Sequence, residues 1–268
     1  MVSAYAAAMR ILITGAARAI GRATADALLA RGHEVVATAR DPQLLADFGG
    51  DVLALDVTDD ASVRACLDAA GELDALVNNA AVIGSGPLED YPIEKLRRVL
   101  ETNTIGTLRM IQGVIPSWRE RGSGVIVNVS SVQGRVATPL EGPYAASKHA
   151  LEAISETLHY EVGHFGIRVV IVEPGFVAPG MKHDDDHVGH AAYDALREQW
   201  SGTDARLNAD GRPGSETVAN AIVGAVEDPG TPLRVPVGDD ANLIFATRKG
   251  LDDAEFEAAM RATLDFTW

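Results

Sequence analysis

Tyr144 and Lys148 are the residues whose types and spacing most directly suggest chemistry. They lie four positions apart in YAASK, within a segment whose pattern predicts a helix over 143–164, so both side chains point to one face of that helix. A free phenol has a pKa of about 10, too high for an efficient base at neutral pH, and a neighbouring cation lowers such a pKa by about 1–3 units. We therefore expect Lys148 to bring the pKa of Tyr144 closer to the range suited to general acid–base work. The pair alone is weak evidence, because this spacing often occurs by chance.

A glycine-containing turn near the start of the chain predicts a dinucleotide site. The segment TGAARAIG (14–21) joins the first predicted strand directly to the first predicted helix. Gly15 allows the sharp turn, and backbone N–H groups at the start of the helix can face a pyrophosphate. Gly21 permits close packing of the helix on the strand. The position of the glycines between strand and helix gives the motif its weight.

Two arginines indicate which dinucleotide to expect. An acidic residue at the end of the second strand would hold the ribose 2′-hydroxyl of NAD, but this chain has alanine there, followed by Arg40. Arg18, inside the turn, can approach the same ribose, and charge-assisted hydrogen bonds are worth roughly 1.5–3 kcal/mol each. The cofactor is therefore predicted to be NADP(H). The nearby acid, Asp41, precedes Pro42 and is expected to cap the next helix.

Strand-like and helical patterns alternate along the chain, which predicts βαβ units and a parallel sheet. The expected fold class is α/β, a doubly wound parallel sheet (Rossmann fold) of about seven strands with helices on both faces, in a single domain over residues 1–268. The expected strands are 10–14, 33–38, 51–55, 74–78, 124–129, 167–172 and 233–237. The expected helices are 19–31, 42–48, 59–70, 92–120, 143–164, 191–200, 215–228 and 253–265.

Two segments are expected to complete the site. Residues 175–214 are rich in Gly, Asp and Pro and follow the sixth strand, at the strand end where open α/β sheets bind ligands, so they are predicted to form a substrate lid. Residues 238–268 are predicted to be a C-terminal helical extension that covers either a neighbouring subunit or its own. An apolar, roomy pocket is expected from Phe176, Val177, Met181, Tyr193, Leu196 and Trp200 in the lid and from Val132, Val136 and Leu140 before it.

Composition excludes several classes of function. The net charge of −15 argues against binding to nucleic acid or an anionic membrane. The single cysteine, Cys66, excludes an internal disulfide and is expected to be a buried, unreactive side chain. No apolar run is long enough to span a bilayer, and the small apolar start, Met1 to Met9, lacks the basic leader of a signal peptide. The expected location is the cytoplasm.

The ordered series of motifs resembles the short-chain dehydrogenase/reductase family, from residue 10 to about 237. It is similar to the compact branch that includes hydroxysteroid and retinol dehydrogenases and their bacterial relatives. The resemblance is carried by TGAARAIG, Asp56-Val57, Asn78-Asn79-Ala80-Ala81, Asn103 in ETNTIG, Ser131 in VNVSSVQG, Tyr144 and Lys148 in YAASK, and Pro174-Gly175.

The resemblance implies a role for each matching residue. Ser131 would orient the substrate oxygen beside Tyr144, and Asn103 would hold a water that links Lys148 to solvent. Strand alternation and the distance to Tyr144 favour Ser131 over the adjacent Ser130. The implied catalytic residues are Asn103, Ser131, Tyr144 and Lys148. The implied cofactor-binding residues are Gly15, Ala17, Arg18, Ile20, Gly21, Arg40, Asp56, Val57, Asn79, Ala80, Tyr144, Lys148, Pro174, Gly175 and Val177.

Three positions depart from the family pattern. The middle glycine of the turn is Ala19, so the backbone must make room for a methyl group near the pyrophosphate. The motif that usually ends in glycine ends in Ala81. The threonine that often follows Pro174-Gly175 is missing from FVAPGM.

The resemblance implies an NADP(H)-dependent oxidoreductase that interconverts a hydrophobic ketone or aldehyde and its alcohol, in a homodimer or homotetramer. Helices 92–120 and 143–164 could pair across a symmetric interface. One alternative is a catalytically silent NADP(H)-binding sensor, and another is an epimerase or dehydratase like the family's longer members. His183, Asp184 to Asp186, His187 and His190 could together bind a divalent ion, but a hydrated loop is the preferred interpretation and no metal is expected.

Overall fold

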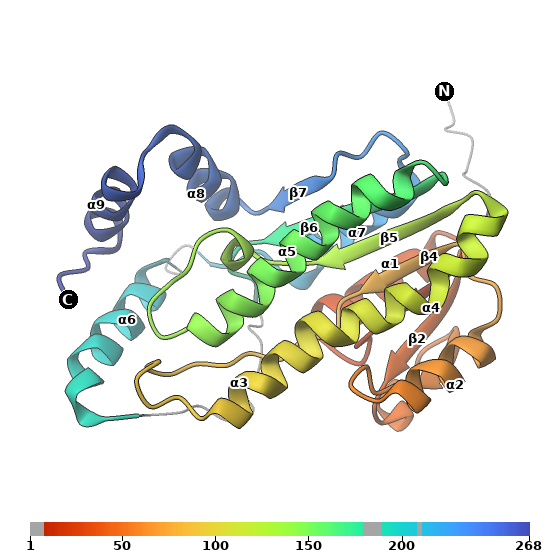
Figure 1. The fold of residues 1–268 in the computed structure, drawn as a ribbon, viewed down its shortest axis with the longest axis horizontal. Coiled ribbons are helices and arrows are strands. Elements are labelled where there is room, and N and C mark those ends of the chain that lie inside the picture. The colour runs from red at the N-terminus through yellow and green to blue at the C-terminus, as the bar shows by residue number, and fades with distance from the viewer. Residues whose placement is uncertain (1–7, 179–188, 208–210) are drawn as a thin grey trace.

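The computed structural model describes residues 8–178, 189–207 and 211–268, and contains a parallel sheet covered by helices on both faces (Figure 1). The predicted fold class is confirmed. The strands are β1 (Arg10–Ile13), β2 (Glu34–Ala39), β3 (Asp51–Ala54), β4 (Ala75–Asn78), β5 (Gly124–Val129), β6 (Ile167–Pro174) and β7 (Arg234–Val237). The helices are α1 (Ala19–Ala30), α2 (Asp60–Ala70), α3 (Ile93–Leu100), α4 (Gly106–Arg121), α5 (Gly142–Gly163), α6 (Asp194–Leu207), α7 (Ser215–Glu227), α8 (Asp239–Gly250) and α9 (Asp253–Leu264). Single turns of other helix types are η1 (Pro42–Leu45), η2 (Glu101–Ile105), η3 (Val132–Gly134) and η4 (Ala191–Tyr193).

The order of the strands fixes where a ligand can bind. The sheet runs β3-β2-β1-β4-β5-β6-β7, and every neighbouring pair is parallel. The chain therefore moves outward from β1 in one direction and from β4 in the other. A crevice opens between the carboxyl ends of β1 and β4, which is where doubly wound sheets bind their ligands.

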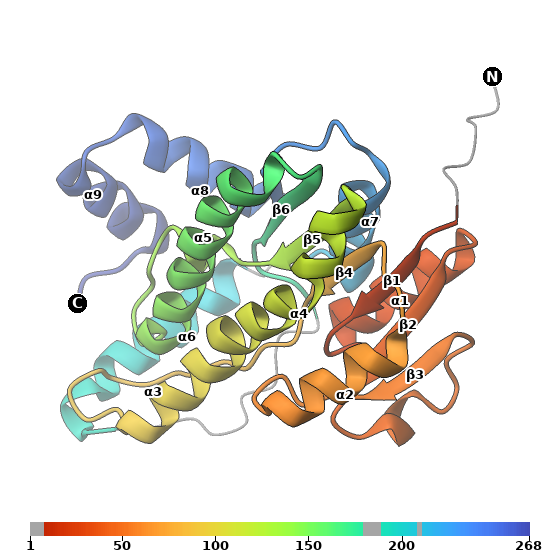
Figure 2. The same ribbon diagram turned by 45° about the vertical axis from the view of Figure 1, so that its right-hand side comes forward.

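Side chains that alternate along the strands fill two cores, one on each face of the sheet. Ile11 and Ile13 pack with α1 and α7, whereas Leu12 between them packs with α2, α4 and α5. Figures 1 and 2 show these two groups of helices on opposite faces. Strands covered on both faces are apolar throughout, which explains why continuous apolar runs predicted them well.

A buried chain of polar groups crosses from the sheet to α5. Asn78 Nδ2 on β4 donates a hydrogen bond of 2.9 Å to Asn128 Oδ1 on β5. Asn128 Nδ2 in turn donates one of 2.8 Å to Ser155 Oγ on α5. These bonds fix the register of the two strands and the position of α5, the helix that carries Tyr144 and Lys148.

Two predicted helices differ in type or continuity from the structure, and the C-terminal extension contains one helix more than the predicted ranges. The helix predicted over 92–120 is divided into α3 and α4 by the π-helical turn η2, which contains Asn103. The helix predicted over 42–48 is only the short 3₁₀ turn η1. The predicted C-terminal helical extension contains two helices, α8 and α9, and a separate range had been predicted only for α9.

Cys66 lies in the core, in the helix α2. Cys66 is 3 % exposed, as predicted, and burial raises the pKa of its thiol to about 11. None of the described helices is long and apolar enough to cross a membrane. Most of the predicted loose extension at the start, residues 1–7, lies outside the described residues.

Candidate active site

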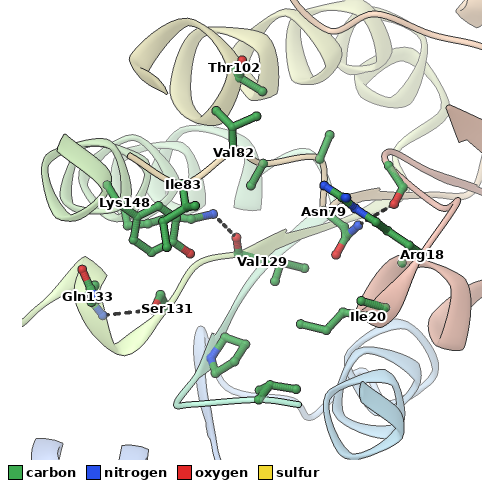
Figure 3. A pocket seen from close by; sticks show the side chains of 18 of the residues that line it. Arg18, Ile20, Asn79, Val82, Ile83, Thr102, Val129, Ser131, Gln133 and Lys148 are labelled. Atoms are coloured by element: carbon green, nitrogen blue, oxygen red, sulfur yellow. Dashed lines mark hydrogen bonds between the residues drawn. The ribbon is translucent and has the colours of Figure 1, made fainter. Parts of the chain in front are cut away.

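A cavity of about 1430 Å³ lies at the carboxyl ends of β1, β2, β4, β5 and β6. All the predicted cofactor-binding residues line it, and so do Ser131, Tyr144 and Lys148. Figure 3 shows Arg18 and Ile20 on one side of this cavity and Ser131, Gln133 and Lys148 on the other. The structure thus brings the glycine-rich turn and the expected catalytic residues into one site.

The turn after β1 is tightly packed and leaves space on its cavity side. Gly15 has a φ of +67°, and a Cβ there would lie 2.9 Å from Ala80 Cα, so only glycine fits without a shift. A Cβ at Gly21 would lie 2.3 Å from Gly15 O and 2.5 Å from Asn79 Nδ2. The helix α1 can therefore approach β1 closely, and its first residues, Ala19 to Gly21, line the cavity, where the start of a helix favours a phosphate.

Thr14 and Asn79 join the ends of β1 and β4. The backbone N–H groups of Asn79 and Ala80 donate to Thr14 Oγ1 at 3.0 and 2.9 Å. Asn79 Nδ2 donates to the carbonyl oxygens of Thr14 and Gly15 at 3.0 and 3.1 Å. These four bonds hold the turn in a fixed shape before any ligand arrives, so the site is preorganised for a dinucleotide.

Ala19 occupies the position of the family's middle glycine in a left-handed conformation, with a φ of 47°. This conformation costs an alanine about 1–2 kcal/mol, whereas glycine adopts it freely and loses about 0.5–1 kcal/mol of conformational entropy instead. We expect Ala19→Gly to raise the free energy of unfolding by up to about 1 kcal/mol, measured by denaturant unfolding. The matched substitution Ala23→Gly, inside α1 without positive φ, is expected to lower it. Equal destabilisation by both would show that Ala19 is not strained.

The arginines predicted to select NADP(H) both lie at one end of the cavity. Arg18 is the residue before α1 and has extended backbone, and Arg40 directly follows β2. Both side chains are exposed and line the cavity beside Asp56 and Val57. Asp41 accepts a hydrogen bond of 3.0 Å from the N–H of Gln43, which confirms its capping role. Two guanidinium groups therefore border this end of the cavity.

Tyr144 and Lys148 project from α5 into the other end of the cavity. Tyr144 is 8 % exposed and Lys148 only 3 % exposed. The Lys148 ammonium donates a hydrogen bond of 2.7 Å to Val129 O and lies 5.6 Å from the centre of the Tyr144 ring. A hydrogen bond also joins Ser131 to Tyr144. The hydroxyl groups of Ser131 and Tyr144 therefore lie next to each other, and the Lys148 ammonium lies near the Tyr144 ring.

The pKa of the Tyr144 phenol in the protein chain alone differs from the expectation. Burial raises the pKa of the phenol well above its usual value, the charge of Glu141 raises it further, and the hydrogen bond with Ser131 opposes both effects. The expectation that Lys148 would bring this pKa towards neutrality is wrong for the protein chain by itself. Tyr144 holds its proton, because a buried phenolate would be poorly solvated. A neutral phenol is a proton donor, which suits the reduction of a carbonyl group.

Burial has the opposite effect on Lys148. It lowers the pKa of the ammonium to about 8, and the negative charge of Glu152 partly offsets this. Because this pKa lies only slightly above neutral pH, most Lys148 side chains remain charged there, and a small further decrease in the pKa would neutralise many of them.

The two adjacent serines at the end of β5 face different neighbours. Ser131 Oγ accepts a hydrogen bond of 3.2 Å from the N–H of Gln133 and contacts Tyr144. Ser130 also borders the cavity, but its Oγ lies next to Gly134, where a Cβ would approach it to 2.6 Å. Ser131 is therefore the serine placed to reach a substrate oxygen beside Tyr144.

Asn103 is the one predicted catalytic residue that does not border the cavity. It lies in the π-helical turn η2 and is 1 % exposed. Its Oδ1 accepts a hydrogen bond from the N–H of Val82, and its Nδ2 donates to Val82 O and to Ser147 Oγ, all within 2.9 Å. The side chain connects the loop after β4 to α5, and its expected role in holding a water stays a prediction.

The substrate end of the cavity is less apolar than expected. Val132, Leu140, Phe176, Val177 and Trp200 line it, as predicted. Among the other predicted residues, Val136, Tyr193 and Leu196 do not line it, and Met181 lies outside the described residues. Additional polar and charged side chains that were not predicted also line it: Arg98, Thr102, Gln133, Glu141, Arg197, Ser201 and Arg212.

The proposed metal-binding run is only partly described. His183, Asp184 to Asp186 and His187 lie outside the described residues. His190 is described, and its Nδ1 accepts a hydrogen bond of 3.1 Å from the N–H of Ala192 at the start of η4. This bond gives His190 a local capping role.

Asp240 supports the turn that lines the cavity after β6, and sequence reasoning missed it. Its Oδ2 accepts a hydrogen bond of 2.7 Å from the N–H of Phe176, in the turn after β6 where the family's threonine is missing. A Cβ at Gly175 would lie 2.1 Å from the same oxygen, so glycine is needed there. The acidic pair Asp239-Asp240 is a signal for the start of a helix, which could have predicted α8.

Three comparisons with known proteins bear on this site. Residues 9–188 match the family model described as short chain dehydrogenase.

Individual relatives match over nearly the whole chain. The chain is 33 % identical to the 3-ketodihydrosphingosine reductase of Bacteroides thetaiotaomicron, and the match covers 94 % of this chain and 96 % of the relative. A short-chain dehydrogenase from Streptomyces avermitilis superposes with a TM-score of 0.80 at 34 % identity, covering 96 % of this chain and 98 % of the other. A short chain dehydrogenase from Burkholderia cenocepacia, solved in complex with NADP, superposes with a TM-score of 0.77 at 26 % identity, covering 96 % and 97 %.

Proposed function

This chain belongs to the short-chain dehydrogenase family and is an oxidoreductase, and we propose that it uses NADP(H) to interconvert a carbonyl compound and its alcohol. The observation that carries this proposal is the shared cavity. Ser131, Tyr144 and Lys148 line the same 1430 Å³ space as the glycine-rich turn and the two arginines. A cofactor held by that turn would thus lie beside a proton donor.

The choice of NADP(H) rests on Arg18 and Arg40. Both border the adenosine end of the cavity, and no acidic side chain takes the position that would hold a ribose 2′-hydroxyl at the end of β2, where Ala39 stands. Two guanidinium groups provide hydrogen-bond donors and charge for a 2′-phosphate. A related structure contains NADP, which supports the same choice.

The proposed mechanism assigns the proton to Tyr144. When bound, reduced nicotinamide supplies the hydride that adds to the carbonyl carbon. Ser131 donates a hydrogen bond that orients the carbonyl oxygen, and the Tyr144 phenol donates its proton to that oxygen as the hydride arrives. The Lys148 ammonium stabilises the phenolate that remains until a proton from solvent replaces the one transferred. In the opposite direction the phenolate accepts the proton of the alcohol.

The substrate is proposed to be a hydrophobic ketone or aldehyde. Val132, Leu140, Phe176 and Trp200 provide an apolar wall next to Ser131 and Tyr144. The name of the relative from Bacteroides thetaiotaomicron describes reduction of a keto compound. The helix α6, within the proposed lid over 175–214, contributes Trp200 and would cover such a substrate.

The test is NADPH oxidation by the full chain with a panel of ketones and aldehydes of increasing apolar size. We expect turnover with NADPH, faster for the bulky apolar members of the panel than for the small ones. Thermal stabilisation by NADPH without turnover of any carbonyl compound would contradict the proposal and favour a catalytically silent sensor.

A further inference from the structure

A group of buried charged side chains lies behind the candidate catalytic residues. Glu152 on α5 is 4 % exposed and Glu173 near the end of β6 is fully buried; we call these two the buried carboxylate pair. Arg234 Nε on β7 lies 3.0 Å from Glu152 Oε2 and 4.0 Å from Glu173 Oε1. Arg135 Nη1, just after η3, lies 3.5 Å from Glu173 Oε1. Carboxylates so deeply buried are uncommon unless they are paired or have a function.

The two carboxylates differ in how well they are neutralised. Arg234 lies nearer to Glu152 than to Glu173, and its Nη2 also binds the more exposed Glu156 Oε2 at 2.7 Å. Burial raises the pKa of Glu173 to about 7, the charge of Glu152 raises it further, and Arg135 and Arg234 oppose both effects. Glu173 therefore takes up a proton as the pH falls through about 7.

Glu152 lies one helical turn beyond Lys148 on the same face of α5. Among the described residues, Val129 O is the one hydrogen-bond acceptor found for the Lys148 ammonium, and it carries no charge. Burial lowers the pKa of Lys148, and Glu152 is the charged group that counteracts this. The effect acts through space along the helix rather than through a direct ion pair.

One oxygen of Glu152 faces the strand end that holds Lys148. Glu152 Oε1 and Ser130 Oγ are buried and have no hydrogen-bond partner among the described residues. Both border the space over Gly134, since a Cβ there would lie 3.1 Å from Glu152 Oε1 and 2.6 Å from Ser130 Oγ. Ser130 directly follows Val129. Arg234 thus holds Oε2 of Glu152, while Oε1 points towards the end of β5.

We propose that Glu152 is a positioning residue for proton transfer, whose buried negative charge keeps the Lys148 ammonium charged beside Tyr144. Arg234 holds the carboxylate in place. Three other charged groups surround this arrangement. Glu156 on α5 also pairs with Arg234, and Arg135 pairs with Glu173. Glu141, just before α5, raises the pKa of Tyr144. The consequence for catalysis rests on the proposed function, whereas the effect on Lys148 does not.

The titration of Lys148 can be measured directly, because the full chain has only four lysines, Lys95, Lys148, Lys182 and Lys249. Protein labelled with ¹³C at the lysine ε-carbons gives one NMR signal for each, and Lys148→Arg assigns the signal of interest. We expect a midpoint near pH 8 in the parent protein. In Glu152→Gln the midpoint should fall by about 1 pH unit, the lower end of the effect of a nearby opposite charge.

Glu156→Gln is the matched control. It removes another carboxylate bound to the same guanidinium, one turn further along α5, and is expected to leave the Lys148 midpoint unchanged. Glu152→Asp keeps the charge and should keep most of the effect. Should Glu152→Gln fail to fold, Glu152→Met removes the charge without leaving an unpaired amide.

The same variants separate the two parts of the proposal. A Lys148 midpoint that is equal in the parent and in Glu152→Gln would overturn it, whether or not the protein turns over any carbonyl compound. If the midpoint falls, the alkaline limb of kcat against pH should move to lower pH by the same amount. A uniform loss of kcat at every pH would instead show that Glu152 has only a structural role.

Discussion

Tyr144→Phe is expected to lower kcat for carbonyl reduction by about 10²–10⁴-fold, the usual contribution of a positioned general acid. The phenol is almost completely buried and keeps its proton. Phenylalanine keeps the ring and its packing but has no proton to donate. The variant should therefore fold and bind NADPH like the parent protein. The measurement is NADPH oxidation at saturating ketone, with cofactor affinity measured separately by fluorescence titration.

A second tyrosine on the same helix provides the control for this experiment. Tyr160 lies four turns further along α5 and is 75 % exposed. Tyr160→Phe should leave kcat and the melting temperature unchanged. If Tyr144→Phe matched the parent rate, the proton would have to come from another group and the proposed mechanism would fail. If the variant lost NADPH binding as well, its low rate would not identify Tyr144 as the acid.

Replacing both Arg18 and Arg40 with alanine is expected to lower the preference for NADPH over NADH by about 10²–10⁴-fold. Each guanidinium is expected to make a charge-assisted hydrogen bond to the 2′-phosphate, worth roughly 1.5–3 kcal/mol, and 1.4 kcal/mol corresponds to a factor of ten. The measured quantity is the ratio of kcat/KM for the two cofactors. NADH has no 2′-phosphate, so its own kcat/KM should change little.

Arg31→Ala serves as the control for net charge. Arg31 directly follows α1, is half-exposed and pairs with Glu227 at 2.8 Å, away from the cavity. Arg31→Ala removes one positive charge, as does either the Arg18 or the Arg40 substitution. It should nevertheless leave the ratio of kcat/KM for NADPH and NADH unchanged. An equal loss of affinity for NADPH and NADH in the Arg18 and Arg40 variants would mean that these residues bind a group common to both cofactors.

The strands and the dinucleotide turn were predictable because their signals are local. Strands such as β5 and β6 are buried on both faces, so continuous apolar runs between turns identify them. The turn after β1 combines a strand, glycines and a helix within a dozen residues. Asp41 could likewise be assigned as a cap from its neighbour Pro42 alone.

Features that depend on contacts between distant segments were not predictable. The π-helical turn at Asn103 inserts one residue into a helical pattern that resumes on both sides. The helix α8 buries few large apolar side chains, mainly Phe245, so its pattern is weak. Glu152 meets Arg234 across 82 positions of sequence, and the resulting charge at Lys148 follows from the three-dimensional arrangement. The raised pKa of Tyr144 is also a consequence of burial, which no motif reveals.

The last residues of the chain bind the helix α6, and this contact places a tryptophan where its fluorescence can report movement of that helix. Gln199 on α6 donates to Thr267 Oγ1 at 2.8 Å and accepts hydrogen bonds of 3.1 Å from the N–H groups of Thr267 and Trp268.

The chain has three tryptophans, and two of them lie at or next to the site. Trp118 is buried in the core, Trp200 lines the cavity from α6, and Trp268 lies next to Tyr193. Any movement of α6 that admits or releases a substrate must change the surroundings of the last two, while Trp118 provides a constant background. Intrinsic fluorescence in a stopped-flow experiment would therefore report the opening of the site without an added label.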